Sequence, residues 1–287
     1  MRSVLITGGS GAFGTACARR LLTLTPYGPT RIAIFSRGEH RQAEMNREMN
    51  AFSPSANWRM RYFIGDVRDR DRLRRAMEGI ELVIHAAALK RIETGNYNPL
   101  EVKRTNIDGA ANVIEAATDA NVRKIVALSS DKAYQPISPY GTSKAFAESL
   151  FLAANNTRGN QGPIFSIVRY GNVWGSTGSV VPTWRKILET SDTVPVTDPD
   201  CTRFFMTMEQ AVDLVLDTAK SMQGGEISIP TLPAYRLGDL AEAMGAKMEV
   251  KGLPPFEKMH ESMDAWQSSD NARRLTVDEL RDILKCT

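Results

Sequence analysis

Short apolar runs alternate with longer amphipathic segments through the first 170 residues of the chain. The apolar runs, which predict buried strands, lie at 4–6, 32–35, 62–64, 82–84, 125–128 and 165–168. Helical spacing of apolar residues appears between them, at 13–24, 40–50, 70–77, 105–119 and 140–155. Strands that alternate with helices pair in parallel through right-handed crossovers, with helices on both sheet faces. The pattern therefore predicts an α/β fold with a doubly wound parallel sheet.

The pattern changes after residue 170, where loops rich in Gly, Pro and Ser surround helical stretches at 180–189, 208–221 and 237–244. Thr276 and Glu279 have the spacing of a capping box, which predicts one more helix near the end. We expect this smaller C-terminal part to cover the carboxyl ends of the strands. In open α/β sheets, ligands bind at those ends.

Composition and charge exclude several classes of function. Hydrophobic residues make up 42% of the 287 residues and charged residues 24%, as in ordinary globular proteins. The net charge of +3 is too small to indicate nucleic-acid binding, and the basic run at 68–75 is interrupted by acidic residues. The three cysteines have no disulfide or metal-ligand spacing, so we expect no metal site and a reducing cytoplasm. We also expect no signal peptide and no membrane span.

A glycine-rich turn follows the first predicted strand and opens the first predicted helix, with glycines at 8, 11 and 14. This context is typical of dinucleotide binding, because the turn brings backbone amides and a helix N-terminus to a pyrophosphate. We expect cofactor contacts from the whole stretch, namely Thr7, Gly8, Ser10, Gly11, Ala12, Phe13 and Gly14.

The end of the second strand indicates which dinucleotide binds. An acidic residue there would bind the ribose hydroxyl of NAD, whereas this chain has Ser36 and Arg37, which favour the 2′-phosphate of NADP. The alternative is that Arg37 is a surface residue of a loop. Further cofactor contacts are expected from the ends of the next strands, at Asp66, Val67, Ala86, Ala87, Ala88 and Lys90.

Tyr140 and Lys144 lie one helical turn apart, so a single helix presents both on one face. We expect the Lys144 ammonium to lower the pKa of Tyr140 and make it a usable base beside a nicotinamide, with both residues contacting the cofactor. Ser129 or Ser130, at the end of the fifth strand, could add a hydroxyl. Together with the glycine turn, this spacing resembles the extended branch of the short-chain dehydrogenase/reductase superfamily.

Asp131 and Lys132 indicate which group of enzymes within this branch the chain resembles. Retaining nucleotide-sugar 4,6-dehydratases have Asp-Glu at this point, and 4-epimerases lack the acid/base pair. The Asp-Lys pair resembles the inverting UDP-N-acetylglucosamine 4,6-dehydratases that begin pseudaminic acid and related pathways. The similarity covers about residues 1–263, through segments at 65–69, 86–90, 97–101, 168–173, 178–182, 202–204 and 257–261.

The resemblance implies a mechanism. Tyr140, supported by Lys144, takes the proton of the hydroxyl on sugar carbon 4 while NADP accepts hydride. Lys132 then removes the hydrogen from carbon 5, and Asp131 protonates the hydroxyl that leaves carbon 6. Hydride returns to carbon 6, and carbon 5 is protonated from the opposite face. Lys132 can act as a base only if burial or a neighbouring cation, such as Lys144, lowers its pKa.

The resemblance also implies substrate contacts, which we expect from Lys90, Lys132, Asn172, Val180, Val181, Arg203 and Glu257. Arg203 could bind a phosphate with two hydrogen bonds. For Lys90 and Arg203 the alternative is a solvated surface charge. Glu257 and His260 could equally organise the lid, and we expect His85 to be a hydrogen-bonded residue at a strand end. The stretch 254–256 is Pro-Pro-Phe where the family has Arg-Pro-Gly, so a cation expected near the nucleotide is missing.

These features predict an NADP-binding domain at 1–172 and a mainly substrate-binding lid region at 173–287, from which some elements return to the first domain. We expect a UDP-sugar as substrate and a homo-oligomer as the assembly. Two alternatives stay open. A nucleotide-sugar 4-epimerase or simple reductase would leave Lys132 without a task, and a non-catalytic NADP-binding homologue would have lost turnover.

Overall fold

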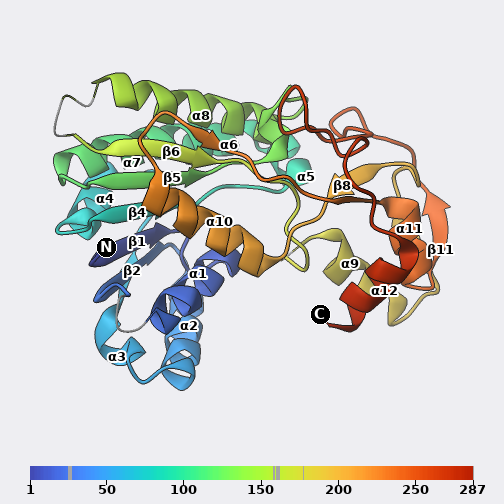
Figure 1. Ribbon diagram of the computed structural model, residues 1–287, viewed down its shortest axis with the longest axis horizontal. Helices are drawn as coiled ribbons and strands as arrows, with labels where there is room; N and C mark the ends of the chain where they lie inside the picture. Colours follow the sequence, from blue (N-terminus) through green and yellow to red (C-terminus); the bar gives the residue numbers. More distant parts are fainter. Residues whose placement is uncertain (25–27, 158, 160–161, 177, 287) are drawn as a thin grey trace.

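A computed structural model describes residues 1–24, 28–157, 159, 162–176 and 178–286. Its main feature is a seven-stranded sheet in the order β3-β2-β1-β4-β5-β6-β9, with every pair parallel (Figure 1). The strands are β1 (Ser3–Thr7), β2 (Arg31–Ser36), β3 (Met60–Ile64), β4 (Leu82–His85), β5 (Lys124–Leu128), β6 (Ile164–Val168) and β9 (Ile227–Ser228). The prediction of a doubly wound parallel sheet is confirmed.

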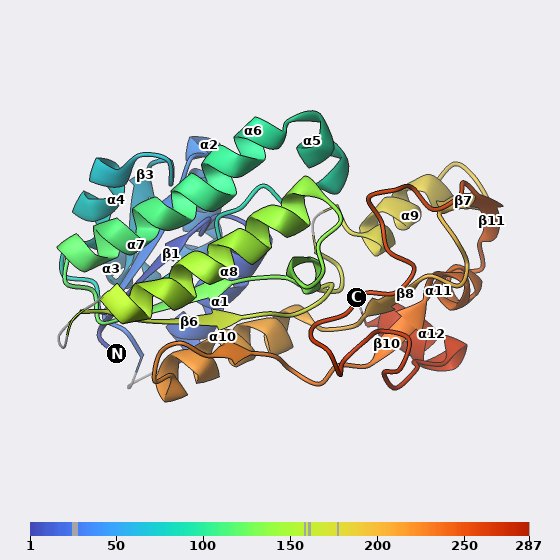
Figure 2. The same cartoon turned by 90° about the horizontal axis from the view of Figure 1, so that it is seen from above.

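Helices cover both faces of this sheet and bury its apolar strands. One face packs against α1 (Ala12–Thr23), α2 (Glu39–Phe52) and α10 (Met208–Ser221). The other packs against α4 (Arg70–Met77), α7 (Gly109–Asp119) and α8 (Pro139–Thr157), and Figure 2 shows α7 and α8 side by side. All five residues of β1 are buried, which explains why its central residues, 4–6, form a continuous apolar run rather than an alternating pattern.

The helix predicted at 105–119 is part of a longer helical stretch. It begins with α6 (Pro99–Val102), passes through a π-helical turn, η1 (Lys103–Asp108), and continues as α7. Two short helices, α3 (Ala56–Arg59) and α5 (Ile92–Tyr97), were not predicted, since neither is long enough to show a period. The π turn contains Asn106, which is 2% exposed and bonded to the segment after β4. Such turns are frequent at functional sites.

The C-terminal part has its own apolar core, built around Trp174, Trp184, Phe205 and Tyr235. In it β8 (Thr202–Phe204) pairs with β10 (Ala234–Arg236), and β7 (Thr193–Val196) pairs with β11 (Lys247–Val250). Its helices are α9 (Val180–Leu188), α11 (Leu237–Ala243) and α12 (Val277–Lys285). The short strands β7, β8, β10 and β11 were not predicted.

Two elements of this C-terminal stretch lie in the main layer instead. Helix α10 packs on α1, β5 and β6, and β9 extends the sheet beside β6 (Figure 1). Thr276 accepts a hydrogen bond from the amide of Glu279, whose carboxylate accepts from the amide of Thr276, so the predicted capping box is confirmed. Within the described ranges, no helix combines the length and apolar character that crossing a bilayer requires.

Candidate active site

The glycine-rich turn between β1 and α1 brings three backbone segments very close together. Gly8 has a φ of +66°, and a Cβ there would lie 2.9 Å from Cα of Ala87. A Cβ on Gly14 would lie 2.4 Å from the carbonyl oxygen of Gly9. Gly11 is the N-cap of α1 and provides no side-chain cap, so the first amides of the helix have no side-chain acceptor. This cradle fits a dinucleotide pyrophosphate.

The hydroxyl of Ser36, at the end of β2, has a fixed position. It accepts hydrogen bonds from Oγ of Ser10 at 2.8 Å and from Nε2 of Gln42 at 2.9 Å. Arg37 extends into solvent, with 57% of its side chain exposed and Nη1 3.7 Å from a carboxylate oxygen of Asp66. Gln42, a buried polar residue of α2, was missed by the sequence reasoning because it falls within an exposed, polar helix.

Asp66 and Val67 follow β3, as predicted, and differ in exposure. Partial burial opposes the ionisation of Asp66, but hydrogen bonds from Arg68 and the charge of Arg37 lower the pKa of this carboxyl below its usual value. Val67 is buried, and its carbonyl oxygen accepts from Nδ2 of Asn112. The carboxylate is therefore the polar group of this pair that a cofactor could meet.

The end of β4 is held against β1 by Thr7 and His85. The Thr7 hydroxyl lies 2.8 Å from Nδ1 of His85 and accepts from the amide of Ala87, so this buried side chain supports the alanine segment. Burial, with a smaller effect of Lys144, lowers the pKa of His85 to about 3 and keeps the ring neutral. His85 is thus a hydrogen-bonded strand-end residue, as expected. Lys90 is exposed.

A short 3₁₀ turn, η2 (Asp131–Ala133), presents the Asp-Lys pair at the end of β5. Ser130 caps this turn: its hydroxyl accepts from the amide of Lys132 and donates to Oδ1 of Asp131 at 2.8 Å. The same Oδ1 lies 3.2 Å from Nζ of Lys132. A Cβ on Gly141 would lie 2.4 Å from the carbonyl oxygen of Lys132, so only glycine allows α8 to pack this closely on η2.

The groups around Lys132 favour its ammonium form. Its Nζ is 3.1 Å from Oε1 of Glu261, a residue that is 2% exposed. Burial alone would lower the pKa of Lys132, but Asp131 and Glu261 outweigh it and raise that pKa above the usual lysine value. The condition that the sequence reasoning set for Lys132 as a base, a pKa lowered by burial or a neighbouring cation, is therefore not met in this arrangement. Burial raises the pKa of Asp131, which favours the protonated acid.

Tyr140 and Lys144 share one face of α8, but Lys144 has a different partner from the one predicted. Its Nζ donates to the carbonyl oxygen of Leu128 at 2.5 Å, and burial lowers the pKa of Lys144 to about 8. Burial raises the pKa of Tyr140, partly offset by Lys132 and by a hydrogen bond with Ser130. The expected lowering of the Tyr140 pKa by Lys144 is therefore wrong, and Lys132 is the opposing cation.

The residues predicted to contact the substrate lie in different environments. Arg203 is 5% exposed on β8, forms an ion pair with Glu257, and donates to the carbonyl oxygens of Thr202 and Met259, so the alternative of a solvated charge is wrong. Asn172 has a buried side-chain oxygen without a hydrogen-bond partner among the described residues. Val180 and Val181 begin α9, where Val181 is 3% exposed in the C-terminal core.

Three buried polar residues that the sequence reasoning missed hold the site together. Asn106 bonds both backbone groups of Leu89 and donates to the Ser143 hydroxyl. Glu148, one turn beyond Lys144, accepts two hydrogen bonds from Arg169, at 2.9 and 2.6 Å, and Arg169 also donates to the carbonyl oxygen of Met263. A charged residue in a helix otherwise facing the core, as at Glu148, is the signal that could have revealed this pair.

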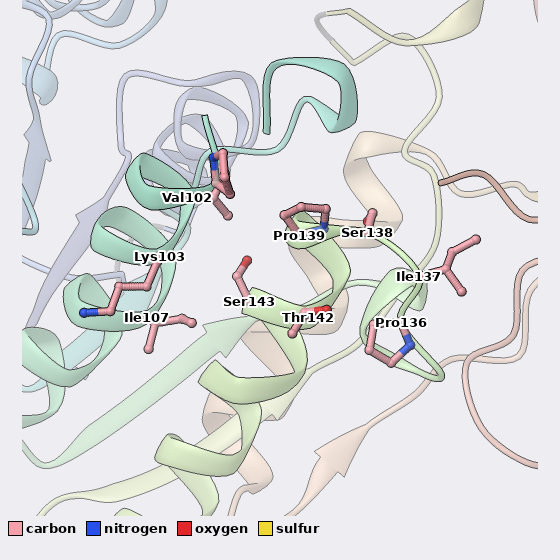
Figure 3. A pocket seen from close by; sticks show the side chains of 10 residues that line it. Val102, Lys103, Ile107, Pro136, Ile137, Ser138, Pro139, Thr142 and Ser143 are labelled. Carbon is pink, nitrogen blue, oxygen red and sulfur yellow. The ribbon is translucent and has the colours of Figure 1, made fainter. Parts of the chain in front are cut away.

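A cavity of about 540 Å³ lies between η1 and the start of α8 (Figure 3). Its lining includes Lys103, Ile107, Ile137 and Ser143, and none of the four predicted catalytic residues. The Ser143 hydroxyl donates to the carbonyl oxygen of Tyr140. The cavity is therefore next to the catalytic helix but separate from the Asp-Lys pair.

Comparison with known proteins supports the resemblance. Residues 4–282 match the family described as polysaccharide biosynthesis protein. The chain is 46% identical over 265 residues, 91% of its length and 77% of the relative's, to a UDP-N-acetylglucosamine 4,6-dehydratase (inverting) from Campylobacter jejuni. It is 37% identical, over 91% and 77% of the two lengths, to a UDP-glucose 4-epimerase from Rickettsia felis.

Among solved structures, Pen from Bacillus thuringiensis superposes with a TM-score of 0.93 at 34% identity, covering 100% of this chain and 98% of Pen. Fold and sequence agree over nearly the whole length. The similarity to inverting UDP-N-acetylglucosamine 4,6-dehydratases that the motifs predicted is confirmed. The chain thus belongs to the polysaccharide biosynthesis protein family, together with these nucleotide-sugar dehydratases.

Proposed function

We propose that this chain catalyses the NADP-dependent 4,6-dehydration of UDP-N-acetylglucosamine with inversion at carbon 5. The product is a UDP-4-keto-6-deoxy-L-hexose for surface-glycan or pseudaminic acid-type biosynthesis. The observation that carries this proposal is the pair of buried Asp131 and partly buried Lys132, with Nζ 3.2 Å from Oδ1, at the end of β5 beside Tyr140. A simple oxidoreductase needs the tyrosine but has no use for a second acid and base.

Each residue has a defined task in this reaction. Tyr140 accepts the proton of the carbon 4 hydroxyl, and the resulting ketone acidifies the hydrogen on carbon 5. Lys132, as the neutral amine, removes that hydrogen, and Asp131, whose burial favours its protonated form, donates a proton to the hydroxyl leaving carbon 6. Lys144, on the next turn of α8 and bonded to the carbonyl oxygen of Leu128, would contact the cofactor rather than lower the pKa of Tyr140.

NADP fits the residues around the glycine-rich turn. The backbone segments at Gly8 and Gly14 lie too close together for side chains, so backbone groups would face a pyrophosphate there. The fixed Ser36 hydroxyl and the solvent-facing Arg37 suit a 2′-phosphate. A bound nicotinamide would supply the hydride acceptor for carbon 4 and the donor for carbon 6. Because the same cofactor is oxidised and reduced within one cycle, we expect NADP to remain bound through purification.

The substrate, assembly and compartment complete the proposal. We propose that Lys90, Asn172, Val180, Val181, Arg203 and Glu257 form the UDP-sugar site. The functional division is an NADP-binding domain at 1–172 and a mainly substrate-binding lid region at 173–287, in a cytoplasmic homo-oligomer. Exposed apolar side chains on α5, α6 and α8, at Tyr97, Leu100 and Phe146, support self-association, which light scattering would measure.

A 4-epimerase is the second candidate, because relatives at 36–37% identity carry that name. The two reactions differ at carbons 5 and 6, since an epimerase leaves both untouched. Lys132 and Asp131 would then have no substrate atom to act on.

Proton NMR of the purified protein with UDP-N-acetylglucosamine in deuterated water tests the proposal. Dehydration replaces the carbon 6 methylene signals with a methyl signal, which collapses to a singlet because solvent deuterium enters carbon 5. Epimerisation changes the carbon 4 couplings without a methyl signal. An unchanged spectrum would instead support a non-catalytic NADP-binding protein.

A further inference from the structure

Glu261 faces the catalytic pair from the C-terminal part of the chain. Its Oε1 lies 3.1 Å from Nζ of Lys132, while Oε2 is 3.9 Å from Nζ of Lys258 and has no hydrogen-bond partner among the described residues. The backbone around it is fixed, because Oγ of Ser269 accepts from the Glu261 amide and donates to the carbonyl oxygen of Thr202. A buried carboxylate held this firmly implies a defined role.

The charges around Lys132 come from every element packed against it. Asp131 and Tyr140 approach from η2 and α8, Arg203 from β8, and Glu261 from the segment that precedes α12. Among the described residues, the titratable or charged groups that interact with Lys132 include Asp131, Tyr140, Arg203, Tyr235, Lys258 and Glu261. Of these, only the two carboxylates favour the ammonium.

We propose that Glu261 is a positioning residue of the dehydration: it holds Nζ of Lys132 against Asp131 and keeps a proton on the Asp131–Lys132 pair. This inference rests on the proposed function. Within the pair, an N–H bond of Lys132 breaks and an O–H bond forms on Oδ1 of Asp131. The result is a neutral amine beside a carboxylic acid, with no change in the net charge of the pair.

The elimination then restores the starting state. The amine takes the proton of carbon 5, and the electron pair of that C–H bond forms the double bond to carbon 6. The C–O bond at carbon 6 breaks, and the Asp131 proton leaves with the hydroxyl as water. Lys132 is again an ammonium, with its Nζ within 3.2 Å of a carboxyl oxygen of Asp131 and 3.1 Å of one of Glu261.

This cycle fails when the pair has lost its proton, because no acid then remains for the leaving hydroxyl. Glu261 prevents that loss, since its negative charge raises the pKa of both Asp131 and Lys132. The two groups titrate as one coupled system. The fall in rate at high pH, the alkaline limb of the pH–rate profile, therefore measures the loss of a proton from the pair as a whole. Removing Glu261 should shift this limb to lower pH.

The test is the pH dependence of 4-keto product formation from UDP-N-acetylglucosamine by the NADP-loaded full-length protein. For Glu261→Gln, the alkaline fall in rate should begin about one to three pH units below that of wild type. Glu261→Asp retains the charge and should restore the limb toward wild type. Glu249→Gln, which removes a carboxylate from exposed β11, should leave the limb in place.

Two outcomes would overturn the inference in different ways. A wild-type protein that makes no 4-keto product overturns the proposed function and this inference with it. An active wild type whose limb is unchanged in Glu261→Gln overturns the inference alone, because a merely structural role lowers the rate equally at every pH.

A second measurement does not depend on the folding of any Glu261 variant. In wild-type protein labelled with ¹³C-lysine, the Lys132 signal is identified by its loss in Lys132→Met. This signal should stay in the ammonium form beyond the ordinary lysine pKa of about 10.4. Titration below that value would contradict the proposed role of Glu261.

Discussion

Lys132 and Tyr140 act on different hydrogens in the proposed reaction, so their removal should stop it at different points. In Lys132→Met the tyrosine can still accept the carbon 4 proton, and reduced cofactor should accumulate after substrate is added. Elimination should slow on the order of a hundredfold to ten-thousandfold, because no group takes the carbon 5 hydrogen. Stopped-flow absorbance at the reduced-nicotinamide band measures the first step, and NMR measures the product.

Tyr140→Phe is the matched control for this prediction. It retains the ring but lacks the base, so neither reduced cofactor nor product should appear. Near-normal formation of inverted 4-keto product by Lys132→Met would exclude Lys132 as the base at carbon 5.

A substitution of Arg37 tests whether the cofactor is NADP or NAD. Its side chain is 57% exposed, and its nearest carboxylate oxygen is 3.7 Å away on Asp66, so it is free to meet a 2′-phosphate. Arg37→Ala should weaken NADP binding about tenfold or more and NAD binding much less, since a charge-assisted hydrogen bond contributes about 1.5–3 kcal/mol. Calorimetric titration with NADP and with NAD would measure both affinities. Arg47→Ala, which removes an exposed arginine from α2, is the control. An equal loss for NADP and NAD would refute the assignment.

At the scale of elements, the packing of α8 on η2 sets the distance between Tyr140 and the Asp-Lys pair. Gly141 makes this contact possible, because a Cβ there would lie 2.4 Å from the carbonyl oxygen of Lys132. Gly141→Ala should therefore displace η2 from α8 and lower kcat by about a hundredfold, the typical cost of a misplaced catalytic group.

The control for this change is Ser149→Ala, on the exposed side of the same helix. It should retain wild-type kcat. Wild-type turnover by Gly141→Ala would show that the contact between α8 and η2 does not position the catalytic groups.

At the scale of the whole molecule, the Glu148–Arg169 pair ties the catalytic helix to the C-terminal part. Glu148 lies on α8, Arg169 follows β6, and the guanidinium also bonds the carbonyl oxygen of Met263. Arg169→Met should reduce the free energy of unfolding by about 3–5 kcal/mol, because it leaves Glu148 buried without a partner. Urea denaturation monitored by circular dichroism would measure this loss.

The double variant Glu148→Gln/Arg169→Met separates the pair from the packing around it. It should recover part of the lost stability, since no unpaired charge then remains buried. If Glu148→Gln reduced the free energy of unfolding as much in the Arg169→Met protein as in wild type, the two residues would be acting independently.

Local features of the sequence determined the fold and most of the chemical groups. Six of the seven strands of the main sheet and the glycine turn were predictable because apolar periods and turn residues act over a few neighbouring positions, whereas the two-residue β9 was not predicted. The spacing of Tyr140 and Lys144 likewise sufficed to place both on one helix face. The short strands of the C-terminal part were not predictable, because their pairing partners lie far away in the chain and each strand has too few residues to show a period.

Only the tertiary structure decided which ionisable groups of the site face one another. It brings Glu261 to 3.1 Å from Lys132 and turns Lys144 toward the carbonyl oxygen of Leu128. The pKa of Lys132 is therefore raised, although a base requires a lowered one, and the pKa of Tyr140 is raised rather than lowered as expected. The physical reason is that the interaction of two charges depends on their distance and burial, not on their separation in sequence. The sequence determined which acids and bases are present, and only folding determined which of them lie close enough to exchange a proton.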